Sequence, residues 1–219
     1  MNPSASLLPR LPSAALAAFA VCSALHLAAV AADTGLPASV TKALLMPLLA
    51  AWLLARGGPR PVVAGLLLST GGDIALEFEG TGPFVTGMAF FAAAHVCYVV
   101  FFLRGGAVAG LRRQWIVPVA YGVVWAAMVV ALWPGLGALR IPVALYSLLL
   151  TATAVTSAGY GLRAGIGGCL FLVSDALIAL GLAGLPRPPV PGLWVMATYI
   201  AAQYLIASGV RAAGGGTEP

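Results

Sequence analysis

The stretch "LLLSTGGDIALEFEG", from Leu66 to Gly80, begins as an apolar helix and then places two carboxylates one helical turn apart, at Asp73 and Glu77. Hydrocarbon is a poor solvent for charge, and an ionisable group near the centre of a membrane helix costs roughly 2.5–3.5 kcal/mol even on a lenient insertion scale. A carboxyl at the position of Asp73 therefore needs either a polar surrounding or a function.

The composition indicates that this stretch lies in a membrane protein, because 61% of the residues are hydrophobic, 8% are charged and the mean hydropathy is +1.02. A spanning helix needs ~20 mostly apolar residues. We expect an all-α polytopic membrane protein with eight transmembrane helices in one domain at 1–210, followed by a disordered tail at 211–219. The eight apolar runs are 13–31, 40–55, 61–76, 84–103, 115–133, 141–158, 164–182 and 193–210.

The basic residues predict the orientation, since Lys and Arg near helix ends are retained on the cytoplasmic side. With the N-terminus inside, only Arg140 and Arg187 fall outside, and both termini are cytoplasmic. The Gly, Pro and Arg usage hints at a bacterium with a GC-rich genome, so the expected location is its plasma membrane. The net charge of +5 requires no nucleic acid partner. The arginines expected on the cytoplasmic side are Arg10, Arg56, Arg60, Arg104, Arg112, Arg113, Arg163 and Arg211.

The N-terminus has an alternative interpretation as a cleaved signal peptide, because Arg10, an apolar run and the small residues of "LAAVAAD" are all present. Cleavage would leave seven spans. The orientation indicated by the arginines of the remaining loops would then conflict with that of the first helix.

Cysteines and histidines indicate neither a disulfide framework nor a metal or other cofactor. Cys22, Cys97 and Cys169 each lie in an expected span, where cysteine usually packs as a small apolar residue. His26 and His95 lie on different helices and form no HxxxH or HExxH motif. A His-Asp-Asp metal site built from separate helices stays open. GxSxG, P-loop and GxGxxG motifs are absent from the sequence.

Polar residues within the spans fall into two layers when depth is counted at ~1.5 Å per residue from the cytoplasmic end of each helix. Asp73 and Asp175 lie roughly 18 and 17 Å deep, and His95 and Gln203 roughly 12 and 11 Å deep. Two aspartates at equal depth predict a polar cavity. Lys42 and Glu77 lie nearer the outer end, in reach of lipid headgroups or water.

Structural explanations compete with functional ones for several of these residues. His95 and Gln203 could hold helices together by hydrogen bonds. Lys42 and Glu77 could be solvated or snorkelling helix ends.

A weak internal similarity pairs the same residues. "LLLSTGGDIAL" around Asp73 aligns with "CLFLVSDALIAL" around Asp175, and "AAAHVCY" around His95 with "IAAQYLI" around Gln203. This pairing predicts two parallel four-helix halves, an arrangement that some membrane folds have.

Five motifs follow one another along the chain: "TKALLMPLL" at 41–49, "GGDIAL" at 71–76, "GMAFFAAAHVCY" at 87–98, "LFLVSDALIA" at 170–179 and "YIAAQYLI" at 199–206. Together, in this order and spacing over most of the chain, they resemble the YhhN-like lysoplasmalogenase family of integral membrane proteins. One departure is Ala43, where the family usually has proline after the lysine; Lys42 itself is kept.

The resemblance implies an enzyme that cleaves the vinyl ether bond of a lysoplasmalogen and releases a fatty aldehyde and a glycerophospho-headgroup. Its partners would then be the lysophospholipid substrate and membrane lipids. Such a reaction needs one protonated carboxyl and one carboxylate, as glycosidases do around an oxocarbenium-like transition state, so we expect Asp73 and Asp175, with His95, to be catalytic. The residues expected to bind substrate are Lys42, Glu77, Tyr98, Ser174 and Gln203.

Two other functions remain open from the sequence. A proton-coupled carrier or lipid-binding protein would also contain intramembrane acids, and the Gly71-Gly72 pair could break a helix as carriers do at their sites. A hydrolase for another ether lipid would use the same scaffold. Aldehyde release by the purified protein separates these classes.

Overall fold

The structure, a computed structural model, describes residues 11–214, with side chains from Pro12 to Val210, and within that range it is helical and has no strand. The prediction of an all-α protein is confirmed for these residues. The elements are α1 (Leu11–Ala31), α2 (Gly35–Ala55), α3 (Arg60–Ala75), α4 (Thr81–Arg104), α5 (Ala107–Arg113), α6 (Ile116–Leu132), the short 3₁₀ helix η2 (Gly137–Leu139), α7 (Arg140–Tyr160), α8 (Leu162–Leu182) and α9 (Pro191–Gly214).

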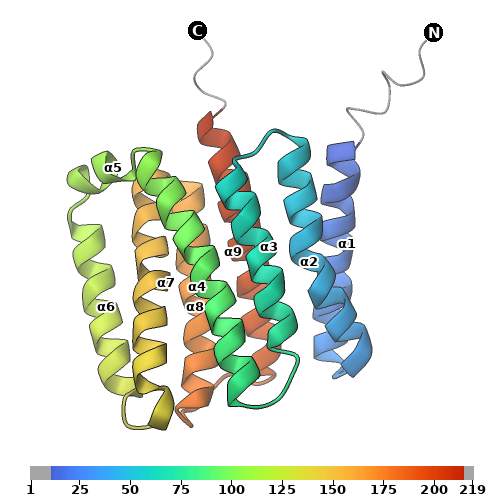
Figure 1. Cartoon of the computed structure of the whole chain (residues 1–219), viewed down its shortest axis with the longest axis vertical. Coiled ribbons are helices and arrows are strands. Elements are labelled where there is room, and N and C mark those ends of the chain that lie inside the picture. The colour runs from blue at the N-terminus through green and yellow to red at the C-terminus, as the bar shows by residue number, and fades with distance from the viewer. Residues whose placement is uncertain (1–10, 215–219) are drawn as a thin grey trace, which may run out of the picture. The chain divides into compact units, whose positions relative to one another are not determined.

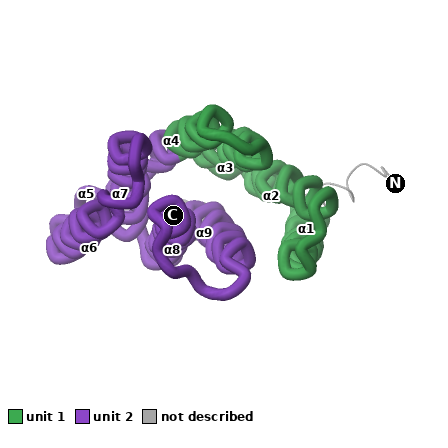
Figure 2. The backbone as a smooth tube through the Cα atoms, turned by 90° about the horizontal axis from the view of Figure 1, so that it is seen from below, with its two compact units in different colours: residues 1–94 green, residues 95–219 purple. Residues whose placement is uncertain are grey.

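The chain divides into two compact units, residues 1–94 and 95–219, which Figure 2 colours green and purple. In the first unit, α2 packs against α1 and α3 (Figure 1). The first part of α4 packs on α3 because two glycines leave room for two rings. A Cβ atom added at Gly72 would lie 2.6 Å from the ring of Phe91, and one at Gly71 would lie 2.8 Å from Phe90.

In the second unit, α8 packs against both α7 and α9, while α6 packs along α7 (Figure 1). The short helix α5 lies across one end of α7, where glycine allows the two backbones to touch: a Cβ atom at Gly110 would lie 2.0 Å from the carbonyl oxygen of Gly159. Small residues at such crossings are typical of helix packing in membranes.

Six of the helices are long and apolar enough to cross a membrane, and a seventh span results if α5 and α6, which meet at a bend of 92°, are counted together. The predicted number of eight spans is therefore not confirmed. Helix α3 has 16 residues and α6 has 17, which is about 24–26 Å of helix at ~1.5 Å per residue, against ~30 Å of hydrocarbon. Helix α5 was not predicted.

The predicted four-helix halves do not coincide with the two units, because the boundary between the units lies inside α4, after Ala94. At the C-terminus, α9 continues to Gly214, four residues into the tail predicted at 211–219. The rest of that tail and Arg10 lie outside the described residues.

Candidate functional site

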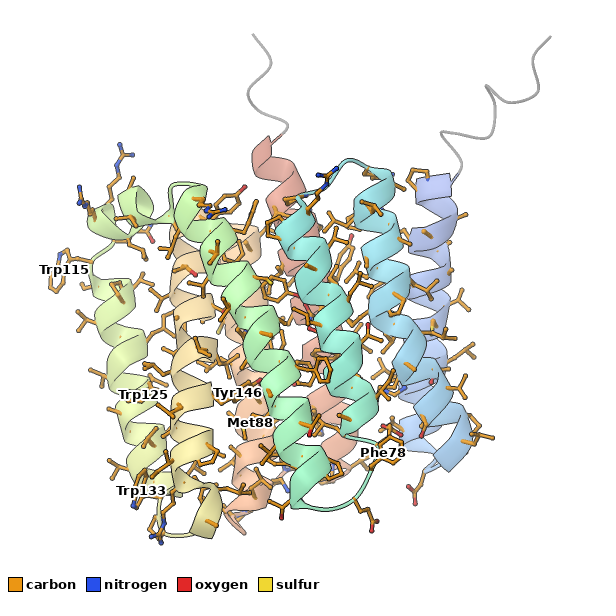
Figure 3. The ribbon with its side chains drawn as sticks, viewed as in Figure 1. Phe78, Met88, Trp115, Trp125, Trp133 and Tyr146 are labelled. Carbon is orange, nitrogen blue, oxygen red and sulfur yellow. The ribbon has the colours of Figure 1, made fainter. Side chains whose placement is uncertain are left out.

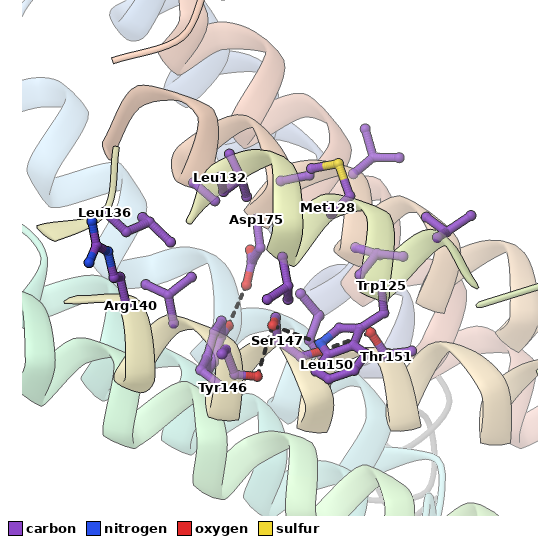
Figure 4. A pocket seen from close by; sticks show the side chains of 18 residues that line it. Trp125, Met128, Leu132, Leu136, Arg140, Tyr146, Ser147, Leu150, Thr151 and Asp175 are labelled. Carbon is purple, nitrogen blue, oxygen red and sulfur yellow. Dashed lines mark hydrogen bonds between the residues drawn. The ribbon is translucent and has the colours of Figure 1, made fainter. Parts of the chain in front are cut away.

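Asp175, on α8, is held by a tyrosine from the neighbouring helix. The hydroxyl of Tyr146, on α7, donates a hydrogen bond to Oδ2 of the Asp175 carboxylate. Figure 4 shows the two side chains pointing toward each other across the space between their helices. Ser174, the neighbour of Asp175, points elsewhere, because its hydroxyl donates to the carbonyl of Val195 on α9 at 3.0 Å. Asp175 thus lies next to a serine that fixes α8 to α9.

His95 joins the same cluster through Tyr146 and Thr153. Its Nε2 lies 3.4 Å from the Tyr146 hydroxyl, and its Nδ1 lies 3.1 Å from the hydroxyl of Thr153 on α7. The ring also packs on Phe171 of α8, with 4.7 Å between the centroids. The imidazole is fully buried, and its two nitrogens face two residues of one helix.

The hydrogen bonds assign the protons of this cluster. The Thr153 hydroxyl donates to the Leu149 carbonyl at 3.2 Å, so it accepts from His95 and the Nδ1 atom carries a proton. In a neutral imidazole Nε2 is then an acceptor. Tyr146 has one proton for two acceptors, Asp175 and His95 Nε2. With Asp175 ionised, that proton goes to the carboxylate; with Asp175 protonated, the carboxyl can donate to Tyr146, which turns its proton to His95.

Beside Asp175 the second unit contains a cavity of about 190 Å³ between α6, α7 and α8 (Figure 4). Arg140 and Leu136 lie at one end, Asp175 and Tyr146 in the middle, and Trp125 and Thr151 at the other end. The other lining residues are Val124, Met128, Val129, Leu132, Val143, Ala144, Ser147, Leu150, Leu172, Val173, Ala176 and Ala179.

Several polar side chains of the lining are already bonded within it. Trp125 Nε1 donates to the Ser147 hydroxyl at 3.0 Å, Ser147 donates to the Ala144 carbonyl at 3.0 Å, and Thr151 donates to the Ser147 carbonyl at 2.7 Å. The cavity therefore presents a mostly apolar wall to a ligand, interrupted by the Asp175–Tyr146 pair in the middle and by Arg140 at one end.

Tyr98 and Gln203, both expected to bind substrate, bind each other. The Tyr98 hydroxyl donates to Oε1 of Gln203 at 2.9 Å, and both side chains are fully buried. This bond fastens α9 to the second part of α4. The structural explanation for Gln203 accounts for this contact, and a substrate role for Tyr98, Gln203 or Ser174 stays a prediction.

Asp73 belongs to the first unit and lies on α3, two residues before its end at Ala75, where the side chain is buried. Helix α3 is continuous through Gly71 and Gly72, so the broken helix considered from this pair is not observed. The two glycines serve packing against α4 instead. Because Asp73 and Asp175 lie in different units, their common cavity stays a prediction.

Lys42 and Glu77 form an ion pair at the end of α3 in the first unit. Lys42 Nζ lies 2.8 Å from Glu77 Oε1, and Ser39 donates a second hydrogen bond to the same carboxylate. Partial burial by itself raises the pKa of Glu77, but the bonds from Lys42 and Ser39 outweigh it and hold the pKa below its ordinary value. The two residues predicted at the outer end are thus neighbours.

No group of three or more His, Cys, Asp or Glu side chains that could hold a metal ion occurs in the part of the chain that the structure describes. His26 and His95 lie in different units and have different partners. His26 Nδ1 lies 3.0 Å from the Thr41 hydroxyl on α2.

The sequence interpretation missed Tyr146 and Thr153. These residues are seven positions apart on α7 and so share one face of the helix. That spacing was the available signal, although Ser147, Thr151 and Thr156 on the same helix carry hydroxyl groups too. It does not reveal which acid or histidine on another helix the two residues face.

The family model described as the YhhN family matches residues 37–210. The chain belongs to the YhhN family. The resemblance inferred from the five motifs is thereby confirmed. The match includes all eight residues expected at the site, from Lys42 to Gln203, whereas His26 precedes it.

Three relatives illustrate the similarity to other YhhN proteins. The chain is 33% identical over 168 residues to Lysoplasmalogenase TMEM86A of Bos taurus, covering 71% of this chain and 67% of the relative. It is 34% identical over 166 residues to a Lysoplasmalogenase of Mycobacterium tuberculosis, covering 68% and 60%. It is 35% identical over 151 residues to Lysoplasmalogenase TMEM86B of Homo sapiens, covering 68% and 63%. The match thus spans about two thirds or less of each relative's length, and no solved structure matches the chain significantly.

Proposed function

We propose that this YhhN protein is an integral membrane lysoplasmalogenase, which hydrolyses the vinyl ether bond of a lysoplasmalogen to a fatty aldehyde and a glycerophospho-headgroup. The observation that carries the proposal is a carboxyl, Asp175, bonded to Tyr146 in the wall of an apolar cavity. Such a site offers an acid to a bond that lies next to a hydrocarbon chain. The relatives named lysoplasmalogenase support the same activity.

The proposed reaction begins with transfer of a proton from a carboxyl to the β-carbon of the vinyl ether. The double-bond electrons form the new C–H bond, and the α-carbon and ether oxygen become an oxocarbenium ion. Water adds to the α-carbon and loses a proton, which gives a hemiacetal. The hemiacetal then breaks its C–O bond to the glycerol, releasing the aldehyde and the free glycerol hydroxyl. One water is consumed, and no redox partner or metal is required.

We assign the proton transfer to Asp175, with Tyr146 and His95 as positioning residues. When Asp175 has given up its proton, the Tyr146 hydroxyl donates to the new carboxylate and stabilises it by a charge-assisted hydrogen bond. The same carboxylate can take the proton from the attacking water. His95, fixed by Thr153, accepts from Tyr146 in the other protonation state.

Asp73 is proposed as the second carboxyl of the reaction, because the sequence predicts the same depth in the membrane for Asp73 and Asp175. A second carboxylate near the oxocarbenium ion would stabilise its positive charge, as in glycosidases. Lys42 and Glu77 are proposed to lie at the outer mouth and to contact the headgroup.

We further propose that α1 to α4 and α6 to α9 all cross the bilayer, with both termini cytoplasmic, in the plasma membrane of a bacterium. Figure 3 shows Trp115 and Trp133 at the two ends of α6, 18 residues apart in sequence, or about 27 Å along a helix. Tryptophan is enriched at both membrane interfaces, so this spacing fits a span despite the short helix. A cysteine at Gly106 should not label from outside intact cells; labelling there would overturn the orientation.

Aldehyde release by the purified, detergent-solubilised protein tests the proposed function. The substrate is a 1-alkenyl lysophospholipid, and the matched control is the 1-acyl lysophospholipid of equal chain length. We expect aldehyde from the first and no fatty acid from the second, with both signals absent from an Asp175→Asn sample. If a well-folded wild type releases no aldehyde from any alkenyl lysolipid, the alternative of a proton-coupled carrier or lipid-binding protein is favoured.

A further inference from the structure

We propose that the α6–α7–α8 cavity binds one lysolipid molecule lengthwise, with its phosphate at Arg140, its vinyl ether at Asp175 and its single hydrocarbon chain running toward Trp125. This inference rests on the proposed function for the chemistry at Asp175, and it adds the direction of the substrate, its phosphate-binding residue and the reason for a single chain.

The order of groups along the cavity matches the order of groups in the lipid. Arg140 lies at the end of the cavity formed by the start of α7 (Figure 4). Tyr146 is six residues further on, or about 9 Å along the helix, and Thr151 a further ~8 Å. In an alkenyl lysolipid roughly seven bonds separate the phosphorus from the vinyl β-carbon, which at about 1.2 Å of extension per bond is roughly 8 Å. A phosphate at Arg140 therefore places the reactive carbon beside Asp175.

Arg140 is held in a position suited to a phosphate. Its Nε donates to the Trp133 carbonyl at 2.7 Å and its Nη2 to the Pro134 carbonyl at 3.3 Å. These bonds use two of the five N–H donors of a guanidinium, and phosphate is a preferred bidentate partner for this group. Among the side chains that the structure describes, the only ion pair is Lys42–Glu77, so the charge of Arg140 is not neutralised by a described carboxylate.

The opposite end of the cavity fits a hydrocarbon chain. Trp125 and Ser147 close on each other by a hydrogen bond, and Met128, Leu150 and Leu172 provide apolar walls. The cavity has a volume of about 190 Å³, which is small against the roughly 300–1,000 Å³ of ordinary ligand pockets. A cavity of this size favours a lipid with one chain over a lipid with two.

The phosphate position is tested by pairing a variant with a substrate that lacks the phosphate. The substrates are a 1-alkenyl lysophospholipid and the 1-alkenylglycerol with the same chain. Arg140→Gln should raise KM for the phospholipid about tenfold or more, the loss of a charged hydrogen bond, and leave KM for the alkenylglycerol unchanged. Arg140→Lys should recover part of the difference. The control is Arg187→Gln, which removes an arginine that lies against Gly181 and does not line the cavity. An equal change on both substrates, or none, would overturn the role of Arg140.

The chain position is tested by filling the cavity. Met128→Trp should lower kcat/KM at least tenfold for long-chain substrates and less for short-chain ones. Met128→Ala, which leaves the space open, should keep kcat/KM for long-chain substrates near the wild-type value. Val130→Trp is the control, because Val130 lies on the same helix, is 73% exposed and does not line the cavity. Equal effects of the two tryptophans would contradict the inference.

A binding measurement separates this inference from the proposed reaction. A photoreactive alkyl ether lysophospholipid, which has no vinyl ether to cleave, should crosslink to peptides of α6 and α8 in the wild type and to a lower extent in Met128→Trp. Crosslinking without aldehyde release would support the cavity and refute the reaction. Aldehyde release with crosslinks confined to other helices would refute binding in this cavity and support the reaction.

Discussion

The carboxyls Glu77 and Asp175 have opposite surroundings, although each is bonded to a neighbouring helix. Glu77 lies beyond the end of α3 with a partly exposed side chain, where Lys42 neutralises it and Ser39 adds a hydrogen bond. Asp175 lies inside α8 on the wall of an apolar cavity, and its described partner is the neutral hydroxyl of Tyr146. A carboxylate paired with a cation is held ionised, whereas a carboxyl bonded to a hydroxyl can exist in either state. The difference supports the proposal that Asp175 supplies the acid, whereas Glu77 forms a charge pair with Lys42.

The largest effect should come from removing ionisation at the aspartates. Asp175→Asn and Asp73→Asn should each lower kcat by about 10²–10⁴-fold, because proton donation and water activation are each typically worth that much. Glu77→Gln should lower kcat far less. Asparagine nearly preserves the shape of aspartate, so circular dichroism and thermal unfolding should match the wild type. Full activity in both asparagine variants would refute the carboxyl mechanism. Full activity in Asp73→Asn alone would show that the reaction needs only the carboxyl of the second unit, Asp175.

A smaller effect is expected at Tyr146. Tyr146→Phe deletes the hydroxyl that donates to Asp175 and should lower kcat by about 10- to 100-fold, the cost of a hydrogen bond to a charged group. His95→Gln should have a weaker effect, because His95 contacts Asp175 only through Tyr146. Tyr160→Phe on the same helix is the matched control, since Tyr160 packs on Phe101 and Phe102. Equal losses in the two tyrosine variants would point to folding, and no loss at Tyr146 would remove its positioning role.

Lys42 should affect binding and not turnover. Lys42→Met should raise KM for the lysophospholipid by about two- to fivefold, as expected for a partly exposed charge, with kcat unchanged. Lys42→Arg, which keeps the charge, should stay near the wild type. Steady-state kinetics on mixed micelles measures both constants. If the methionine variant leaves both constants unchanged, Lys42 is a snorkelling side chain paired with Glu77.

The smallest effect concerns stability and pH. The pKa of Glu77 lies below its ordinary value of 4.5 in the folded protein, so the Lys42–Glu77 pair stabilises the fold above pH 4.5 and loses this contribution as the pH falls through the lowered pKa. Glu77→Gln should cost less than about 1 kcal/mol at pH 7. Thermal unfolding in detergent from pH 7 to pH 3 should show the variant and the wild type converging at the acid end. A constant difference across that range would contradict the pairing.

Particular residues show how far the sequence could predict this structure. The eight long helices lie within a few residues of the apolar runs, because length and hydropathy are local properties. Helix α5 was missed because it has seven residues and ends in Arg112 and Arg113, which look like a charged loop. The short length of α3 was predicted, because the apolar run at 61–76 has the same 16 residues as the helix. The run at 115–133 is two residues longer than α6, since it includes Trp115 and Trp133 at the two ends of the helix.

For the candidate site, the sequence could single out residues but not the contacts between them. Composition and motifs identified Asp175 and His95, since charged and polar groups are rare in membrane helices. The contacts depend on which faces of the helices pack against each other. Examples are the pairing of Lys42 with Glu77, 35 positions apart, and the position of Tyr146 between Asp175 and His95. Packing determines those faces, and one sequence does not record them.

Hydrolysis in deuterium oxide tests the central claim, that a carboxyl protonates the vinyl ether on carbon. The purified protein cleaves a 1-alkenyl lysophospholipid in this solvent, borohydride traps the aldehyde at once as the alcohol, and mass spectrometry locates the label. The proposed mechanism predicts a single deuterium on the carbon next to the former aldehyde carbon, with product formation lost in Asp175→Asn. Aldehyde that carries no deuterium at that carbon would contradict protonation of the double bond and with it the role assigned to Asp175.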